Sequence, residues 1–206
     1  MKSQGKVYVV DDEPDLRQAL KRVLLAEGLE VEGYGSAADF LAAVADDAVG
    51  CLVLDLSMPG VDGLQLQQRL TGAKSILPIV FLTGRGDIPT SVQAIKAGAV
   101  DFLTKPVKRV DLLRAVHAAL ERAGQLAGGQ QATAELRARY EQLTPREREV
   151  FGQVISGRLN KVIAARLGTT EQTIKVHRGR VMEKLGVASV PELVRAAQAL
   201  DVSPPD

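Results

Sequence analysis

Residues 7–12 read Val-Tyr-Val-Val-Asp-Asp and residues 51–55 read Cys-Leu-Val-Leu-Asp, two short apolar runs that each end in acidic side chains. Three further short apolar runs occur in the first half of the chain, and helical patterns fill the intervals between them. The candidate strands are 7–10, 31–34, 51–54, 79–82 and 101–103, and the candidate helices are 14–26, 37–45, 63–70, 88–97 and 109–122. This alternation favours an α/β domain with a doubly wound, five-stranded parallel sheet that has helices on both faces.

Polar side chains stand at the carboxyl ends of four of these strands, where open parallel sheets bind their ligands. They are Asp11 and Asp12, Asp55, Thr83 and Lys105. Three neighbouring carboxylates repel one another, and a divalent cation that prefers oxygen ligands, Mg²⁺ or Mn²⁺, relieves the repulsion. A carboxylate nucleophile, a metal site, a cation and a hydroxyl together suit the formation of an aspartyl phosphate. Taken singly, the Asp pair also fits an ordinary strand-end turn and Lys105 a surface lysine.

Composition and charge favour two small domains with different partners. Of 206 residues, 46% are hydrophobic, and the single cysteine, Cys51, excludes an intramolecular disulfide and fits a buried apolar position. Neither a signal-peptide pattern nor an apolar run of about 18 residues occurs, which predicts a cytoplasmic protein without a membrane partner. Residues 1–121 carry 13 Lys and Arg against 16 Asp and Glu, a net −3, whereas residues 122–206 carry 13 against 9, a net +4. A basic C-terminal part fits a nucleic-acid reader.

A linker separates the two parts. Gly124, Gly128 and Gly129 interrupt a polar, Gln- and Ala-rich stretch, which predicts a flexible point followed by a linker helix from about residue 133. The domains are therefore expected at residues 1–122 and 143–206, with the partly helical linker at 123–142.

The last 64 residues are predicted to be all-helical. Thr144-Pro145-Arg146-Glu147 is a capping box with proline at the first helical position. The expected helices are 145–156, 160–167, 171–185 and 190–200. Gly168-Thr169-Thr170 forms a short turn between the second and third of them, which is the pattern of a helix-turn-helix.

The third of these helices has an apolar side and a basic side. Ile174, Val181 and Leu185 recur at helical spacing and are expected to face the core. Its basic residues, which are thereby left for solvent or DNA phosphate, are Lys175, Arg178, Arg180 and Lys184.

Residues 5–121 resemble the receiver domain of two-component response regulators. The resemblance is carried by Val9–Glu13, Leu54–Gly60, Asp62-Gly63, Leu82–Gly84, the Ala97–Ala99 turn with Asp101–Leu103, and Lys105-Pro106. It implies that Asp55 accepts a phosphoryl group from a sensor histidine kinase, and that Asp12, Asp55 and the Ser57 carbonyl bind Mg²⁺ directly while Asp11 acts partly through water. It further implies that Lys105 pairs with the phosphate, that Thr83 and Phe102 form a switch, and that the bond before Pro106 is cis.

Residues 141–200 resemble a LuxR-type helix-turn-helix, so that the whole chain is similar to the FixJ/NarL response regulators. The matching stretches are Leu143–Val150, Asn160–Ala164 and Thr173–Arg178. The resemblance implies that Lys175, Val176 and Gly179 face bases, and that Arg178, Asn160, Lys161 and Thr173 contact phosphates; Arg180 lies on the same basic helix. The expected function is a phosphorylation-dependent transcription factor, an activator that binds promoter DNA as a homodimer, with RNA polymerase as a further candidate partner.

Two other functions compete with this one. In the first, a phospho-regulated adaptor, the C-terminal helices bind protein instead of DNA; the basic helix argues against it. In the second, an enzyme turns over an aspartyl phosphate. Such enzymes usually place an acidic residue two positions after the nucleophile, where this chain has Ser57. We therefore expect no enzyme and no catalytic residues.

Overall fold

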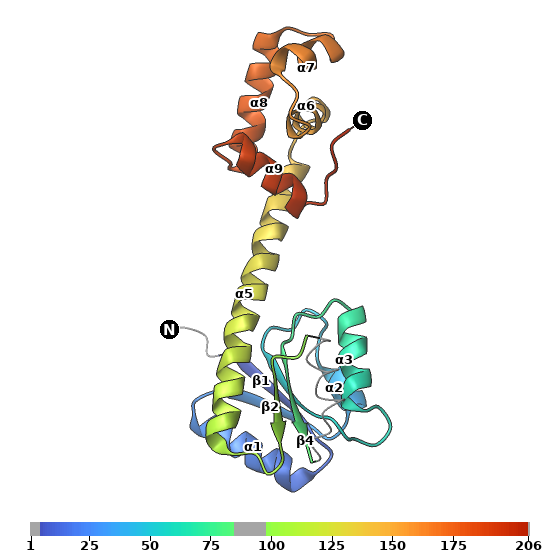
Figure 1. Ribbon diagram of the computed structural model, residues 1–206, viewed down its shortest axis with the longest axis vertical. Coiled ribbons are helices and arrows are strands. Elements are labelled where there is room, and N and C mark those ends of the chain that lie inside the picture. The colour runs from blue at the N-terminus through green and yellow to red at the C-terminus, as the bar shows by residue number, and fades with distance from the viewer. Residues whose placement is uncertain (1–4, 85–97, 206) are drawn as a thin grey trace. The chain divides into compact units, whose positions relative to one another are not determined.

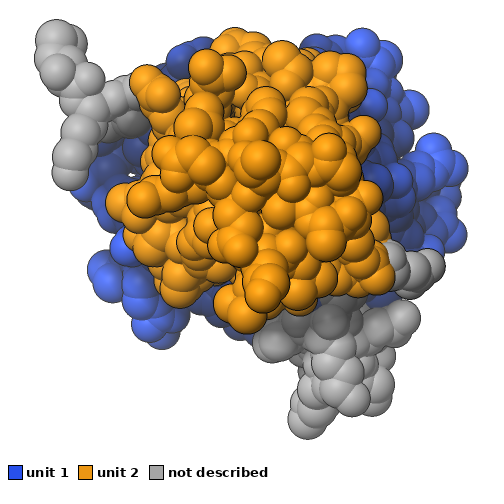
Figure 2. Space-filling model, turned by 90° about the horizontal axis from the view of Figure 1, so that it is seen from above, with its two compact units in different colours: residues 1–128 blue, residues 129–206 orange. Residues whose placement is uncertain are grey.

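The computed structural model describes residues 5–84 and 98–205 (Figure 1). The chain divides into two compact units, residues 1–128 and 129–206 (Figure 2). No helix of the described residues is long and apolar enough to cross a membrane.

The N-terminal unit contains the predicted five-stranded parallel sheet, in the order β2-β1-β3-β4-β5. Its strands are β1 (Lys6–Val10), β2 (Glu30–Tyr34), β3 (Cys51–Asp55), β4 (Ile79–Thr83) and β5 (Asp101–Thr104). Its helices are α1 (Pro14–Ala26), α2 (Ala37–Ala43), α3 (Gly63–Gly72) and the first part of α5 (Arg109–Glu141). The predicted elements are confirmed to within a few residues, with two exceptions: the helix expected at 109–122 continues to Glu141 within α5, and helix 88–97 lies outside the described residues.

Alternate residues of each strand build two separate cores, because successive side chains of a strand point to opposite faces. On one face, Val7, Val9 and Val53 pack with α1 and α5, through Leu24 and Val116 among others. On the other face, strand residues such as Val10, Leu54 and Phe81 pack with α2 and α3. Every residue of β3 and β4 is buried, so the sheet centre, where Asp55 ends β3, is fixed from both sides.

The predicted flexible point near residue 124 is wrong as regards secondary structure, because α5 runs through it as one helix of 33 residues. A Cβ added at Gly124, Gly128 or Gly129 would meet nothing within 4 Å. Each glycine costs about 1 kcal/mol of helix propensity, and the Ala, Gln and Leu residues around them are good helix formers. Extending a helix that already exists is easier than starting a new one, so the helix continues.

The C-terminal unit contains the four predicted helices, α6 (Pro145–Ile155), α7 (Asn160–Arg166), α8 (Glu171–Leu185) and α9 (Val190–Ala199). Thr144 and Glu147 form the reciprocal capping box at the start of α6, and Thr170 caps α8 by accepting from the Thr173 N–H. Gly168, at φ 63°, makes the turn between α7 and α8 in a left-handed conformation that glycine adopts readily. The core gathers Phe151, Ile163, Ile174, Val181 and Leu193 with their neighbours.

Candidate functional site

Three carboxylates meet at the carboxyl edge of the sheet. β1 pairs directly with β3, so Asp11, Asp12 and Asp55, which come at or just after the ends of these strands, lie side by side. One carboxylate oxygen from each lies within 4.8 Å of the others. Asp11 is fully buried and Asp55 is 3% exposed, whereas Asp12 is open to solvent. The predicted acidic cluster is therefore present.

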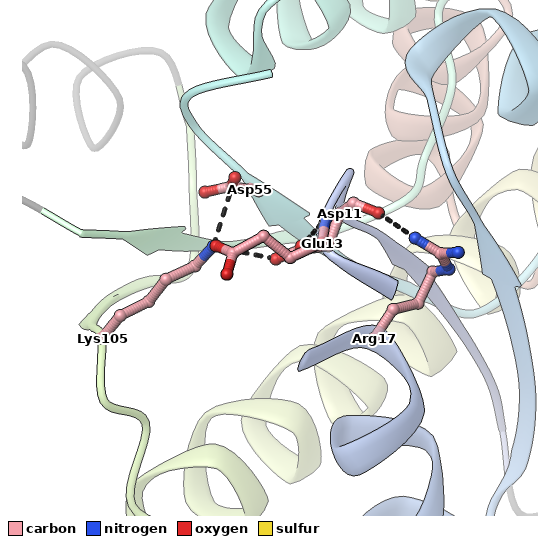
Figure 3. A network of polar contacts seen from close by, with 5 residues as sticks. All are labelled: Asp11, Glu13, Arg17, Asp55 and Lys105. Atoms are coloured by element: carbon pink, nitrogen blue, oxygen red, sulfur yellow. Dashed lines mark hydrogen bonds and ion pairs between the residues drawn. The ribbon is translucent and has the colours of Figure 1, made fainter. Parts of the chain in front are cut away.

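Lys105 reaches into this cluster from the loop after β5 (Figure 3). Its Nζ lies 3.0 Å from Asp11 Oδ2, 3.2 Å from Asp55 Oδ2 and 3.0 Å from Glu13 Oε1. The Lys105 backbone N–H donates to the Thr83 carbonyl at 2.6 Å, and this bond holds the Lys105 backbone beside the end of β4. The bond between Lys105 and Pro106 is cis, as the resemblance implied.

Burial is the main influence on the charge of Asp55. It raises the pKa of this carboxyl group, Lys105 opposes the rise, and the nearby charge of Asp11 adds to it. For Lys105, burial alone would lower the pKa, but the carboxylates of Glu13 and Asp11 outweigh it and raise the pKa, so the ammonium stays charged.

The donor atoms fit a hard divalent cation. Lys105 provides one positive charge against the carboxylates of Asp11, Asp12, Asp55 and Glu13, so negative charge remains in excess. Asp55 Oδ1 is buried and has no hydrogen-bond partner among the described residues. A buried, unpartnered carboxylate oxygen is costly unless something supplies positive charge or a proton. Oxygen ligands alone, without sulfur or nitrogen, suit Mg²⁺ or a similar ion.

The remaining predicted residues of this site flank the cluster. Thr83 ends β4 and is 1% exposed. Phe102, in β5, is half-buried, and its ring centroid lies 6.3 Å from that of Phe81. Ser57 and Pro106 are both exposed, and the Ser57 backbone N–H lowers the pKa of the Asp55 carboxyl group. Sequence reasoning assigned no role to Glu13, since its partner Lys105 lies 92 positions away.

In the C-terminal unit, the predicted DNA-contacting residues gather on α8 and the start of α7. Those that are exposed are Lys161, Lys175, Val176, Gly179 and Arg180, and those that are half-buried are Asn160, Thr173 and Arg178. The Arg178 guanidinium donates to Asn160 Oδ1 at 3.4 Å and so joins the two helices. A Cβ at Gly179 would meet nothing within 4 Å, so packing does not require glycine there.

An open hollow of about 480 Å³ lies beside these residues. Its lining includes Arg158, Lys161 and Arg178, with Glu171 as the acidic member. Three cations against one carboxylate give the hollow a positive charge, which suits a phosphate of the DNA backbone.

Lys184 has a different place from the one expected. It was grouped with the basic residues left for solvent or DNA, but its Nζ lies 2.6 Å from Glu147 Oε2, and Glu147 is only 3% exposed. Lys184 also donates to the Gln142 carbonyl at 3.3 Å. Lys184 therefore joins the end of α8 to the start of α6. Local spacing does not reveal this pair, because the lysine and the capping-box glutamate lie on different helices.

Comparison with known proteins assigns both units. Residues 7–117 match the family described as response regulator receiver domain, and residues 141–197 match bacterial regulatory proteins of the luxR family. Nodulation protein W of Bradyrhizobium diazoefficiens is 43% identical over 197 residues, which cover 96% of this chain and 87% of the relative. The transcriptional regulatory protein FixJ of Azorhizobium caulinodans is 40% identical over 200 residues, covering 97% and 95%. The solved structure of the response regulator StyR is 41% identical, with a TM-score of 0.79 and coverage of 94% and 98%.

These matches and the sheet order define a two-component response regulator with a DNA-binding output domain. The chain belongs to the FixJ-like family of transcriptional regulators, which combine a receiver domain with a LuxR-type helix-turn-helix. Members of this family are response regulators and transcription factors and not enzymes, and their class implies a sensor kinase and DNA as partners. The acidic residues Asp11, Asp12 and Asp55 form the cluster that is typical of a receiver metal site.

Proposed function

We propose that a sensor histidine kinase phosphorylates Asp55 and that the phosphorylated protein binds promoter DNA as a homodimer and activates transcription, with RNA polymerase as its further partner. The observation that carries the proposal is the burial of the Asp55 carboxylate together with the surroundings of its two oxygens. It is buried at the end of β3, with one oxygen unpartnered and the other 3.2 Å from Lys105. The proposed location is the cytoplasm, because the sensor kinase and the DNA would both be accessible there.

The transfer itself requires a nucleophile and charge neutralisation. One oxygen of Asp55 forms the new P–O bond, while the P–N bond of the kinase's phosphohistidine breaks and its electron pair returns to the imidazole. Asp12, Asp55 and the Ser57 carbonyl would hold Mg²⁺, with Asp11 acting partly through water. When bound, Mg²⁺ supplies the positive charge that offsets the oxygens of the incoming phosphoryl group. Lys105, with its Nζ 3.2 Å from Asp55 Oδ2, adds a second, protein-borne positive charge.

The signal is proposed to pass through Thr83 and Phe102. A phosphoryl group adds roughly −1.5 to −2 charges and three acceptor oxygens. The Thr83 hydroxyl moves towards these oxygens, and the half-buried ring of Phe102 turns into the space that Thr83 leaves. Support comes from their positions, because Thr83 ends the strand next to Asp55 and Phe102 lies on the neighbouring strand.

The DNA end of the proposal rests on the exposed part of α8. Lys175, Val176 and Gly179 would read base edges in the major groove. Arg178, Asn160, Lys161 and Thr173 would hold phosphates beside them, and Arg180 would add to the positive field of the same helix. The burial of Ile174, Val181 and Leu185 keeps the opposite side of α8 in the core.

The test combines phosphorylation with DNA selection. Wild type and Asp55→Asn are treated with acetyl phosphate and Mg²⁺, the modified residue is identified by mass spectrometry, and DNA bound by the phosphorylated protein is selected from a random pool. We expect modification at Asp55 only in the wild type, and tighter binding of the selected DNA after modification. Modification at another residue would refute the assignment of Asp55. A modified protein that selects no DNA sequence but captures a protein would support the adaptor instead.

A further inference from the structure

We propose that Glu13 is a positioning residue that holds Lys105 while the phosphoryl group is absent and competes with that group for the lysine. This inference rests on the proposed phosphorylation of Asp55. The Lys105 Nζ has three carboxylate partners at similar distances: 3.0 Å to Asp11, 3.2 Å to Asp55 and 3.0 Å to Glu13. Only Glu13 lies outside the predicted metal-ligand set.

The side chain of Glu13 is turned towards the lysine instead of towards its own helix. Glu13 is the N-cap residue of α1, a position where the shorter Ser, Thr, Asp and Asn side chains accept a hydrogen bond from the first helical turn. Here the Glu13 side chain makes no capping bond, and Oε1 instead accepts a hydrogen bond from Lys105 Nζ. The Glu13 backbone N–H donates to Asp11 Oδ1 at 2.8 Å, which ties the residue to the acidic cluster (Figure 3).

The three partners of Lys105 are not equivalent once a metal ion is bound. A divalent cation held by Asp12 and Asp55, and by Asp11 partly through water, would compete with the ammonium for the negative charge of Asp11 and Asp55. This competition leaves Glu13 as the partner that holds Lys105 until phosphoryl oxygens are present. Glu13 is 63% exposed at its side chain, so its hold on the lysine is weakened by water and can be exchanged for phosphoryl oxygens.

Two opposite effects of removing this carboxylate follow. Without the charge of Glu13, the site attracts a divalent cation less, and Lys105 stays more firmly on Asp11 and Asp55, so metal affinity falls. With the metal already bound, Lys105 is held less firmly away from phosphoryl oxygens, and one repelling charge is gone, so affinity for a phosphoryl mimic rises. A purely structural role would not move the two affinities in opposite directions.

Glu13→Gln tests the inference, because it keeps the length of the side chain and removes its charge. Asp15→Asn is the matched control: Asp15 is an exposed acid in the first turn of the same helix. The full chain is titrated with Mg²⁺ by calorimetry and then, at saturating Mg²⁺, with beryllium trifluoride, a mimic of the phosphoryl group. For Glu13→Gln we expect the Mg²⁺ Kd to rise about threefold to tenfold and half-saturation with the mimic to need about threefold less of it. Asp15→Asn should change either value by less than about twofold.

The outcomes separate this inference from the proposed function. Wild type that binds neither Mg²⁺ nor the mimic would refute both. Wild type that binds both, together with a Glu13→Gln variant that matches it or shifts both affinities in the same direction, would overturn the role of Glu13 alone. Circular dichroism of the same samples shows whether α1 and the sheet are intact, and a Glu13→Asp variant, which keeps the charge on a shorter side chain, should restore part of the wild-type Mg²⁺ affinity.

Discussion

Removing the charge of Glu147 should loosen the C-terminal unit more than removing any exposed carboxylate of α6. Glu147 is 3% exposed, and its Oε2 accepts from Lys184 Nζ at 2.6 Å and from the Thr144 N–H at 2.9 Å. Deleting one partner of a fully buried ion pair costs about 3–5 kcal/mol. The Lys184 side chain is 33% exposed and can turn towards water, so we expect about 2 kcal/mol for Glu147→Gln. Glu147→Ala also removes the capping box, and should cost about 1 kcal/mol more.

Hydrogen exchange of the full chain, followed by mass spectrometry, measures this effect locally. Amides in the middle of α6 and α8 should exchange about thirtyfold faster in Glu147→Gln, because each 1.4 kcal/mol corresponds to a factor of ten. Glu149→Gln is the matched control, since Glu149 pairs with Arg146 at 2.8 Å on the surface of the same helix and is 52% exposed. It should change the opening free energy by less than about 0.5 kcal/mol. Equal effects of the two substitutions would refute the importance assigned to the buried pair.

The pH dependence of Glu147, the charge of Asp55 and the glycines of α3 and α5 give four further expected outcomes. Lys184 and the Thr144 backbone N–H hold the pKa of Glu147 below its usual range. The stabilisation by the Glu147 carboxylate should therefore be complete above the unfolded-state pKa of about 4.3 and be lost as the pH falls through the lower folded-state pKa. Urea unfolding of wild type and Glu147→Gln across pH 3–7 measures this loss. Burial raises the pKa of Asp55, so its ionised form opposes folding at neutral pH; Asp55→Asn should raise the thermal midpoint in EDTA and abolish the further rise on adding Mg²⁺. A Cβ at Gly63 would lie 2.6 Å from the Asp55 carbonyl oxygen, so Gly63→Ala should cost about 1–3 kcal/mol in chemical unfolding and weaken Mg²⁺ binding, whereas an unchanged midpoint would contradict the fit. Alanine at both Gly128 and Gly129 should raise the free energy of local opening of α5 by about 1 kcal/mol for each substitution and so slow hydrogen exchange of the amides at these positions. Unchanged exchange would show that the two glycines do not lower the stability of the helix there.

Local signals were sufficient to predict most of the fold. The apolar runs that end at Asp11 and Asp55 gave strands of the expected length, and the spacing from Thr144 to Glu147 gave a capping box that the structure contains. Such features depend on residues close together in sequence. The meeting of Asp11 with Asp55 followed from a general rule about parallel sheets, which is why the acidic cluster could also be predicted.

The features that could not be predicted depend on distant partners or on a small difference between two conformations. Lys105 finds Glu13 across 92 positions and Lys184 finds Glu147 across 37, and nothing in the spacing of either lysine distinguishes it from a surface residue. The glycines of α5 indicate a break when taken locally, but the good helix formers around them favour continuation. Propensity alone does not decide between conformations that differ so little in free energy.

The division of α8 between a core side and an exposed side has an evolutionary consequence. Ile174, Val181 and Leu185 are buried and pack α8 against the core, whereas Val176 is exposed and a Cβ at Gly179 would meet nothing within 4 Å. With the base contacts proposed above, substitutions at these exposed positions would change which DNA sequence the protein prefers without weakening the fold. Duplicated copies of such a regulator could diverge towards new genes by a few changes on one helix face while the scaffold beneath stays the same.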